Sequence, residues 1–230
     1  MALILVTGAS RGIGLELACQ YAEAGDKVIA TCRDPETANA LKHLEQSHPT
    51  VELQTLDVVD SLSILSLASL LSKRGDKLDV LINNAGMLVQ EDPGEWTADA
   101  FSASLETNVV GPAMIMQAFE KVMADGGKMI SISSGLGSFG MALDFGGPTG
   151  TYAASKAALN MVVCQLAPRL KQKGIVAVAF NPGWVKTDMG GQEATYTPQE
   201  SVSSLRESFA KLTLDQAGQF IDHNYDSLPW

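Results

Sequence analysis

The sequence contains few residues that could cross-link the chain or hold a metal ion. Its 230 residues include three cysteines, Cys19, Cys32 and Cys164, which form no CxxC pair. An odd number of widely spaced cysteines argues against a disulfide framework and is typical of the reducing cytoplasm, where we expect this protein. The three histidines form no HExxH motif, so the sequence predicts no zinc site.

Long apolar runs are also missing. No unbroken apolar run exceeds six residues, the length of Ile175–Phe180. A helix needs about 20 apolar residues to cross a bilayer, so we do not expect an integral membrane protein. The apolar segment Met1–Val6 has no cationic stretch and no cleavage site, which favours a first strand over a signal peptide.

Positive charge is scarce. The chain has 16 Lys and Arg against 26 Asp and Glu, a formal net charge of −10. An acidic surface repels phosphate backbones, so we expect no nucleic-acid partner. With 46% hydrophobic and 18% charged residues, the chain has enough apolar material for a core and too little charge for disorder.

Short apolar runs alternate with longer segments of helical periodicity. This alternation predicts βαβ units and a parallel sheet covered by helices on both faces. Right-handed crossovers then favour a doubly wound α/β Rossmann fold with a mainly parallel, seven-stranded sheet in one domain, residues 1–230. The expected strands are 3–6, 27–32, 51–56, 78–82, 128–133, 175–180 and 219–221. The expected helices are 13–24, one that opens at Asp34-Pro35, 61–74, 98–123, 151–173 and 198–212.

Prolines and two aperiodic segments interrupt this pattern. Gly111-Pro112 predicts a break in the fourth helix, and Pro168 predicts a kink in the fifth that costs roughly 3 kcal/mol relative to Ala. Two segments without a clear period, about 135–150 and 189–200, follow strand ends. Ligands of doubly wound sheets bind at that edge, so we expect both segments to be substrate loops.

A glycine-rich turn lies between the first strand and the first helix. Thr7–Gly14 reads TGASRGIG, which spaces its glycines as GxxxGxG. Glycines allow a sharp turn and let a pyrophosphate approach the backbone, while the N-terminus of the next helix offers free N–H groups. A turn without a ligand is the alternative, but the strand before it and the helix after it favour a dinucleotide site.

The end of the second strand favours NADP over NAD. An NAD site commonly places Asp or Glu there to bind the ribose 2′-hydroxyl. Here the small Cys32 takes that position and Arg33 follows, and a guanidinium group fits a 2′-phosphate. Arg11 could supply a second positive charge. Asp34 leaves the other interpretation open, because its carboxylate could bind a 2′-hydroxyl if the strand ends one residue later.

Tyr152 and Lys156 lie four residues apart on an expected helix, so their side chains share one face. None of the other three tyrosines has a Lys at that offset. Such a pair can also be an ordinary exposed helix pair, so its meaning depends on the motifs around it.

These motifs occur together in an order that resembles the short-chain dehydrogenase/reductase family over nearly the whole chain. The matching residues are TGASRGIG at 7–14, Asp57, Asn83-Asn84-Ala85-Gly86, Asn108, Ser133-Ser134, Tyr152, Lys156, Asn181-Pro182-Gly183 and Thr187. Within the family, Pro182–Gly191 and Leu228-Pro229-Trp230 resemble carbonyl reductases related to bacterial C-factor and insect sniffer proteins. The resemblance implies a small-molecule carbonyl or alcohol substrate, NADP as cofactor and a homodimer or homotetramer.

The resemblance also implies roles for individual residues. Tyr152 would be the general acid in reduction and the base in oxidation, while Lys156 would lower the pKa of the phenol and bind the nicotinamide ribose. Ser134 would hold the substrate oxygen, and Asn108 would hold a water that connects Lys156 to solvent. The residues expected to bind the cofactor are Gly8, Ser10, Arg11, Gly12, Ile13, Gly14, Arg33, Asp57, Val58, Asn84, Ala85, Gly86, Tyr152, Lys156, Pro182, Gly183, Val185 and Thr187.

Several of these assignments have alternatives. Ser134 is preferred to the adjacent Ser133 as the serine that binds substrate. Asp57 either contacts adenine or caps a helix, and Asn84 is expected to brace the turn after its strand rather than to react. The segment 139–147 makes the Ser-to-Tyr spacing longer than is usual in the family, and it forms either an apolar substrate wall or a surface excursion.

We therefore expect a cytoplasmic carbonyl reductase that prefers NADPH. The alternative is an NADP-binding signalling protein of the C-factor type that does not require catalysis, although an intact Tyr/Lys pair argues against it. Apolar side chains in the two loops suggest a fairly hydrophobic substrate. These loop residues are Phe139, Met141, Leu143, Phe145, Met189 and Tyr196.

Overall fold

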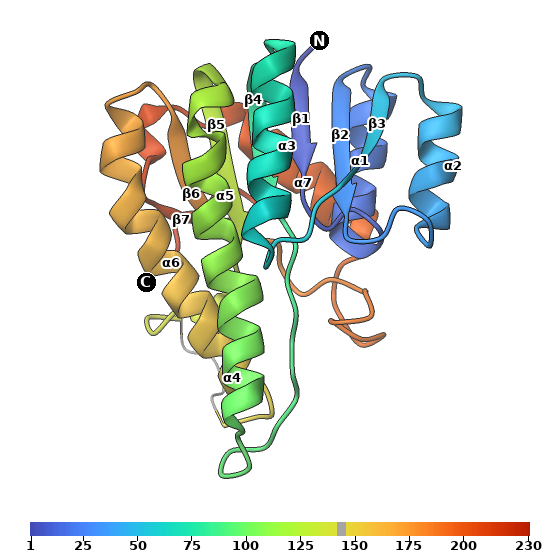
Figure 1. Ribbon diagram of the computed structural model, residues 1–230. Helices are drawn as coiled ribbons and strands as arrows, with labels where there is room; N and C mark the ends of the chain where they lie inside the picture. The colour runs from blue at the N-terminus through green and yellow to red at the C-terminus, as the bar shows by residue number, and fades with distance from the viewer. Residues whose placement is uncertain (142–145) are drawn as a thin grey trace.

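The computed structural model describes residues 1–141 and 146–230. Its centre is a seven-stranded sheet with the order β3-β2-β1-β4-β5-β6-β7 (Figure 1). Every pair of neighbouring strands is parallel, so the predicted doubly wound α/β fold is confirmed. The strands are β1 (Leu3–Val6), β2 (Lys27–Cys32), β3 (Val51–Thr55), β4 (Leu78–Asn83), β5 (Met123–Ile132), β6 (Val176–Asn181) and β7 (Phe220–Asp222).

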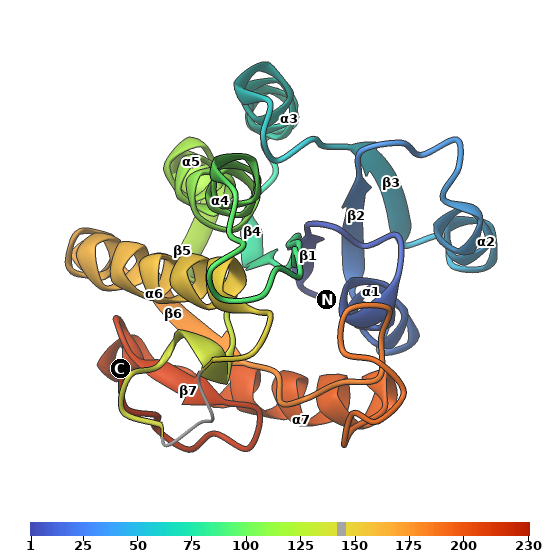
Figure 2. The same ribbon diagram turned by 90° about the horizontal axis from the view of Figure 1, so that it is seen from below.

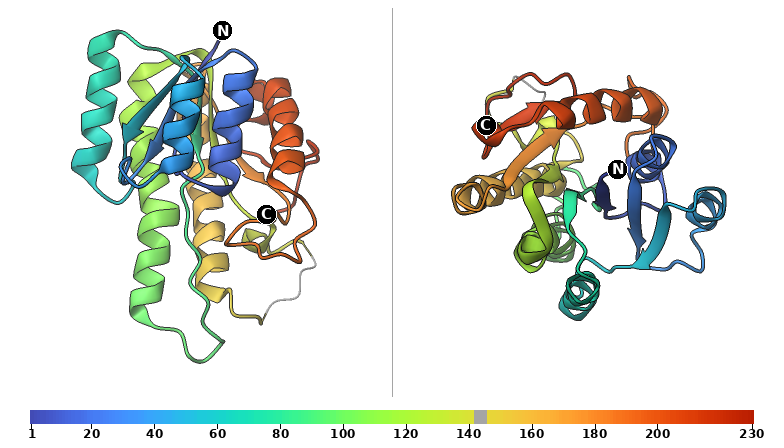
Figure 3. Two further views of the ribbon diagram at one scale, coloured as in Figure 1. Left: turned by 90° about the vertical axis from the view of Figure 1, so that its right-hand side faces the viewer. Right: turned by 90° about the horizontal axis from the view of Figure 1, so that it is seen from above.

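Helices cover both faces of this sheet (Figures 2 and 3). The helices are α1 (Gly12–Glu23), α2 (Asn39–Ser47), α3 (Ser61–Arg74), α4 (Ala98–Leu105), α5 (Gly111–Phe119), α6 (Gly150–Lys171) and α7 (Pro198–Lys211). α1, α2 and α7 bury apolar side chains together with Ile4 and Val6 of β1. α3, α5 and α6 do so on the other face with Leu5. Successive strand residues therefore enter opposite cores, which explains why the strands are apolar throughout.

The direction of strand addition reverses between β1 and β4. From β1 the chain builds outward to β2 and β3, then crosses back so that β4 pairs with the other side of β1. The carboxyl ends of two such strands leave a crevice between the connections that follow them, and ligands of open α/β sheets bind there. Figure 2 looks onto this edge of the sheet.

The second helix begins later than the sequence pattern predicts. The prediction that Asp34-Pro35 opens it is wrong, because the chain makes a turn there and α2 starts at Asn39. The Asp34 carboxylate accepts hydrogen bonds from the Glu36 N–H at 3.0 Å and from the Thr37 hydroxyl at 3.0 Å. Asp side chains compete with helical hydrogen bonds in this way, which favours turns over helix interiors.

The predicted break near Gly111-Pro112 is confirmed, and it takes the form of a π-helix. Residues Glu106–Val110 form this π-helix between α4 and α5, and the Gly111 N–H bonds to the Glu106 carbonyl, five residues back. Pro112 has no N–H to give to the carbonyl of Asn108, its partner in an α-helix. Asn108 therefore lies in a turn whose hydrogen bonds follow the π pattern instead of the α pattern.

The start of β5 and the course of α6 at Pro168 also differ from the prediction. β5 starts at Met123 instead of residue 128, since Met123 pairs with Leu78 before a register shift, and regular pairing resumes at Lys128. α6 is not divided at Pro168 and continues to Lys171. Because Pro168 lies in the last turn, little helix remains beyond it that a break could disrupt.

Candidate active site

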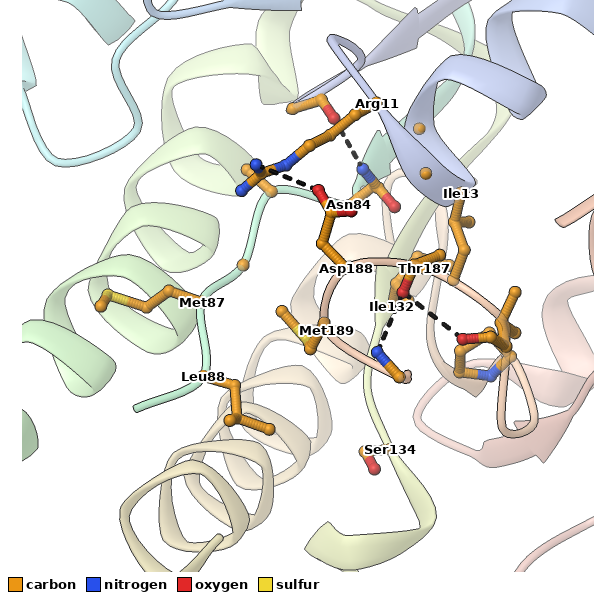
Figure 4. A pocket seen from close by; sticks show the side chains of 18 of the residues that line it. Arg11, Ile13, Asn84, Met87, Leu88, Ile132, Ser134, Thr187, Asp188 and Met189 are labelled. Carbon is orange, nitrogen blue, oxygen red and sulfur yellow. Dashed lines mark hydrogen bonds and ion pairs between the residues drawn. The ribbon is translucent and has the colours of Figure 1, made fainter. Parts of the chain in front are cut away.

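A cleft of about 860 Å³ lies at the carboxyl edge of the sheet, over β1, β4, β5 and β6. Figure 4 shows Met87 and Leu88 from the segment after β4 on one side, and Thr187 and Met189 from the loop after β6 on the other. Ser134 lies at the end of the view away from Arg11. All residues predicted to bind the cofactor line this cleft, namely Gly8, Ser10, Arg11, Gly12, Ile13, Gly14, Arg33, Asp57, Val58, Asn84, Ala85, Gly86, Tyr152, Lys156, Pro182, Gly183, Val185 and Thr187.

The glycine turn has the geometry of an anion cradle. Gly8 and Gly12 have φ of +64° and +56°, in the left-handed region that favours glycine. A Cβ added at Gly8 would lie 2.7 Å from the Cα of Ala85, so only glycine lets the two turns approach. The N-cap residue of α1, Arg11, makes no side-chain cap. The N–H groups of the first turn of α1 are thus available to a pyrophosphate, which fits a dinucleotide cofactor.

The end of β2 presents Arg33, not Asp34, to the cleft. Cys32 and Arg33 line the cleft, whereas the Asp34 carboxylate is bonded within the turn that follows. Arg11 also lines the cleft and forms an ion pair with Asp188 at 3.3 Å, and both side chains are largely exposed (Figure 4). The cations that the sequence singled out therefore both lie at the cleft, and the competing carboxylate of Asp34 is held elsewhere.

Asn84 braces the glycine turn, as expected. Its Nδ2 donates to the carbonyls of Thr7 at 2.9 Å and Gly8 at 3.1 Å. The Asp57 carboxylate accepts from the Val59 N–H at 3.1 Å, and α3 is capped by Asp60 instead. Asp57 lines the cleft, so the structure does not support the alternative in which it caps the helix.

Tyr152 and Lys156 lie one turn apart on α6 and are both almost fully buried. The Lys156 Nζ lies 5.5 Å from the centre of the Tyr152 ring and donates a hydrogen bond to the Ile132 carbonyl at 2.8 Å. This bond ties α6 to the end of β5, so both side chains are held in fixed positions beside the cleft.

Burial shifts the pKa values of these two groups in opposite directions. It raises the pKa of Tyr152 to about 12, a rise that an interaction with Ser134 opposes. It lowers the pKa of Lys156 to about 8. Desolvation disfavours the charged form in each case. Burial therefore sets the direction of the shift at Tyr152, and the Lys156 ammonium is bonded to the Ile132 carbonyl. The role of Lys156 in lowering the pKa of the phenol stays a prediction.

The two adjacent serines have different surroundings. The Ser133 hydroxyl is buried and donates to the Asn160 Oδ1 at 2.6 Å, which joins the end of β5 to α6. The Ser134 hydroxyl interacts with the phenol of Tyr152 and accepts from the Leu136 N–H at 3.2 Å. Ser134 is thus the serine with a hydroxyl beside the Tyr152 phenol, and its role in binding substrate stays a prediction.

Asn108 lies behind the cleft, and both the oxygen and the nitrogen of its side-chain amide have hydrogen-bond partners. Its Oδ1 accepts from the Met87 N–H at 2.9 Å, and its Nδ2 donates to the Met87 carbonyl at 2.8 Å and the Ser155 hydroxyl at 2.9 Å. A Cβ on Gly86 would lie 3.3 Å from the Asn108 Oδ1 and 3.7 Å from the Lys156 Nζ. The Asn108 side chain therefore fixes the segment after β4 against α6, close to Lys156.

The loop after β6 closes on itself beside the glycine turn. The Thr187 hydroxyl accepts from the Gly190 N–H at 3.1 Å, and the Trp184 indole donates to the Gly190 carbonyl at 2.8 Å. Met189 lines the cleft, but Phe139 of the other loop is 85% exposed and does not. The expectations for Leu143 and Phe145 fall outside the described residues.

Sequence reasoning missed several residues that position the site. Thr7 accepts hydrogen bonds from the N–H groups of Asn84 and Ala85, both at 3.0 Å. Ser155 joins Asn108 to the Tyr152 carbonyl, to which its hydroxyl donates at 2.7 Å. Thr7 and Ser155 each lie inside a recognised motif, and this position was the one sign in the sequence that they help to build the site. Threonine and serine are too common for their residue type to identify them.

Within 1–141 and 146–230, no group of three or more His, Cys, Asp or Glu side chains is arranged to hold a metal ion. No helix in these ranges is both long enough and apolar enough to span a membrane.

Several known proteins resemble this chain in sequence and in structure. Residues 2–197 match the short chain dehydrogenase family. An NADPH-bound carbonyl reductase from chicken fatty liver is 35% identical and covers 100% of this chain and 99% of its own, with a TM-score of 0.93. The carbonyl reductase Sniffer of D. melanogaster is 28% identical, covers 100% of both chains and has a TM-score of 0.92. C-signal of Myxococcus xanthus is 33% identical over 66% of this chain and 93% of its own.

Proposed function

Since the chain belongs to the short-chain dehydrogenase family and is an oxidoreductase of that family, we propose that it is a carbonyl reductase that prefers NADPH. The observation that carries this proposal is the composition of one cleft. Tyr152, Lys156 and Ser134 line it together with the uncapped start of α1 and with Arg33. A proton donor, a phosphate cradle and a cation suited to a 2′-phosphate thus share a single cavity.

Tyr152 would supply the proton that carbonyl reduction requires. A bound nicotinamide cofactor supplies the hydride that the carbonyl carbon receives. The carbonyl oxygen must then gain a proton to become an alcohol. Because burial raises the pKa of Tyr152 to about 12, its phenol is protonated at neutral pH and can donate. Ser134 would donate a hydrogen bond to the same oxygen and hold it against the phenol.

Lys156 and Asn108 would act on the phenolate that forms when Tyr152 donates its proton. When Tyr152 gives up its proton, a positive charge on the neighbouring Lys156 stabilises the phenolate. Lys156 would also bind the nicotinamide ribose. Asn108 would hold the water that returns a proton to Lys156, through its backbone carbonyl, since both ends of its side-chain amide have partners. That carbonyl cannot receive an α-helical bond from Pro112.

The preference for NADPH would come from Arg33 and Arg11. Both line the cleft in an otherwise acidic protein, and Asp34 is bonded into its own turn. A 2′-phosphate carries two charges that a guanidinium can bind through parallel hydrogen bonds.

We expect Arg33→Ala to weaken NADPH binding by about 10- to 100-fold, the loss of one charge-assisted hydrogen-bonded contact. NADH binding should change little, because NADH lacks the phosphate. Fluorescence titration of both cofactors measures this, with Lys27→Ala at the other, exposed end of β2 as the control. Equal weakening of both cofactors would contradict the assignment of Arg33.

The proposed activity is tested with purified protein, NADPH and a panel of aldehydes and ketones. We expect NADPH oxidation matched by an equal amount of alcohol for at least one carbonyl class, and slower turnover with NADH. A protein that binds NADPH and yet reduces no member of a broad panel would contradict the proposal.

A signalling role without catalysis is the second candidate, and the similarity to C-signal favours it. The presence of Tyr152, Lys156 and Ser134 together in the cleft favours the enzyme. In a host where deletion of the gene has a phenotype, the enzyme proposal predicts that the Tyr152→Phe protein fails to restore function. Full restoration would favour the signalling role.

We also propose that the protein is a homodimer or homotetramer and resides in the cytoplasm. Met114 of α5 and Met161 of α6 are exposed apolar side chains on neighbouring helices, the kind of surface that an interface buries. The cysteines are free, as expected in a reducing compartment. Light scattering should give a mass two or four times that of the chain, and cell fractionation checks the compartment.

A further inference from the structure

A second pocket, of about 350 Å³, adjoins the cleft. It lies between the N-terminal half of α6 and the segments that contain Trp96 and Phe139. Leu136 and Thr149 line both this pocket and the cleft, so the two cavities meet at these residues. Both residues lie close to the proposed catalytic side chains, because Leu136 follows Ser134 by two residues and Thr149 precedes Tyr152 by three.

The lining of the second pocket is apolar. Pro93, Trp96, Ala153 and Ala157 contribute to it, and none of its described lining residues carries a charge. Trp96 is 46% exposed and Phe139 is 85% exposed at its margin. Aromatic surface left in water is unfavourable, and a concave apolar site of this kind is typical of a ligand site.

The walls of this pocket are held in place by contacts from distant parts of the chain. The Trp96 ring packs against Gly150, where an added Cβ would come within 2.5 Å of the ring, and it meets Phe101 edge-on at 5.9 Å. Fixed aromatic walls favour a pre-formed binding site over a surface that merely happens to be apolar.

The C-terminal residues hold the opposite wall. The Ser138 hydroxyl donates to the Pro229 carbonyl at 2.6 Å, and the Gly140 N–H donates to the Trp230 carbonyl at 2.7 Å. Trp230 itself stacks on Phe220 of β7 at 5.7 Å. The segment after Ser134 is thereby tied to the edge of the sheet, which keeps this wall of the pocket open.

We propose that this second pocket binds the apolar arm of the carbonyl substrate while the carbonyl group lies in the cleft. This inference rests on the proposed reductase function and names its substrate class: ketones and aldehydes that carry an alkyl chain or an aromatic ring beyond the reacting carbon. Ala153 and Ala157 lie beside Tyr152 and Lys156 on α6, so an arm in the pocket directs its carbonyl toward the phenol.

The test is a homologous series of straight-chain methyl ketones, from 2-butanone to 2-decanone, at saturating NADPH. In the wild type, kcat/KM rises by up to about fourfold for each methylene that enters the pocket. Ala157→Leu fills the pocket, so it lowers kcat/KM for 2-decanone by at least tenfold more than kcat/KM for 2-butanone. Ala154→Leu, at a more exposed lining position, gives the same pattern more weakly. Ala210→Leu, exposed on α7, is the control.

Two results overturn the proposal. One is a wild-type kcat/KM that does not increase with chain length; the other is an Ala157→Leu protein that loses activity equally on short and long ketones. If the wild type reduces no ketone, the proposed function fails, and calorimetry with 1-decanol then tests the pocket alone. Binding by the wild type and its loss in Ala157→Leu supports the pocket, and no binding by the wild type overturns it.

Discussion

At the scale of single residues, the proposed chemistry depends on two buried ionisable groups with opposite pKa shifts. Burial raises the pKa of Tyr152 to about 12 and lowers that of Lys156 to about 8. A phenol that keeps its proton is a donor, and an amine that loses its charge easily is a carrier that can accept and pass on a proton. In the proposed mechanism, the raised pKa of Tyr152 favours the protonated phenol from which reduction starts.

These shifts predict different pH profiles for the two directions. Reduction uses the protonated phenol, so deprotonation of Tyr152 should not lower kcat/KM between pH 6 and 9. Oxidation uses the phenolate, whose fraction increases roughly tenfold per pH unit below the pKa, so kcat/KM for an alcohol should rise with pH. Steady-state rates in both directions check this. An oxidation rate that is greatest near neutral pH would contradict the raised pKa.

The adjacent serines predict a contrast between two similar variants. Ser134→Ala should lower kcat by about 10- to 1,000-fold, because the substrate oxygen loses a hydrogen-bond donor, with little change in stability. Ser133→Ala removes the donor to the buried Asn160 and should cost about 1–3 kcal/mol of unfolding free energy. Urea unfolding and kinetics of both variants measure the contrast, and a reversal of the two effects would exchange their roles.

The spacing of residues was enough to predict that Tyr152 and Lys156 share a helix face, but it did not predict their electrostatics. Four residues on a helix place Tyr152 and Lys156 on one face whatever surrounds them. The pKa values depend on burial and on the Ile132 carbonyl, which becomes a neighbour of Lys156 only when α6 packs on β5. The Asp34 carboxylate illustrates the same limit, since its bonds to Glu36 and Thr37 form only in the folded turn. These bonds favour the NADP interpretation, which stays a prediction.

At the scale of elements, apolar periodicity predicted all seven strands in their order along the chain. The ends of helices and strands depended on local hydrogen bonding. The start of α2 moved because an Asp side chain stabilised a turn. The break at Gly111-Pro112 was predictable from the missing N–H of proline, but the choice of a π-helix was not. The missing N–H of proline predicts where the helix breaks, whereas the packing around Asn108 determines that the break is a π-helix.

The junction between α5 and α6 predicts a pH-dependent contribution to stability. Glu120, buried just after α5, forms ion pairs with Arg169 at 2.8 Å and with Lys173. Burial raises the pKa of Glu120, but its bonds to Lys173 and Arg169 outweigh this, and the pKa is lowered overall. A lowered folded-state pKa stabilises the fold above the unfolded pKa of about 4.3, and this stabilisation is lost as the pH falls through the folded-state value.

We therefore expect Glu120→Gln to lower the free energy of unfolding by about 1–3 kcal/mol at pH 7 and by less below pH 4. Urea unfolding at a series of pH values measures this. Glu23→Gln, at an exposed position at the end of α1, is the control and should have little effect at any pH. A loss that is equal at pH 7 and pH 3 would show that the Glu120 charge is not what stabilises the junction.

At the scale of the whole molecule, the site is assembled from segments at the carboxyl ends of six strands, β1 to β6. The βαβ alternation predicted that these ends would meet, because parallel strands carry their connections at one edge. It could not predict the second pocket, whose walls depend on contacts between Trp96 and Gly150 and between Ser138 and Pro229. Irregular segments take their shape from such tertiary contacts and not from a periodic pattern.

Because the cofactor cleft joins both halves of the sheet, cofactor binding should stabilise the whole fold. At a free NADPH concentration 100 times its Kd, linkage adds about 2.7 kcal/mol to the unfolding free energy. Thermal unfolding should therefore shift upward with NADPH, less with NADH at the same concentration, and less for Arg33→Ala with NADPH. Equal shifts with both cofactors would contradict the predicted preference.

The most direct measurement is a comparison of Tyr152→Phe with the wild type in which cofactor binding and turnover are determined on the same samples. The phenol is assigned to proton donation and not to folding. The proposed role of Tyr152 therefore predicts an NADPH Kd within about twofold of the wild type and a kcat for ketone reduction lower by about 100-fold or more. A Tyr152→Phe protein that reduces the ketone as fast as the wild type would contradict it.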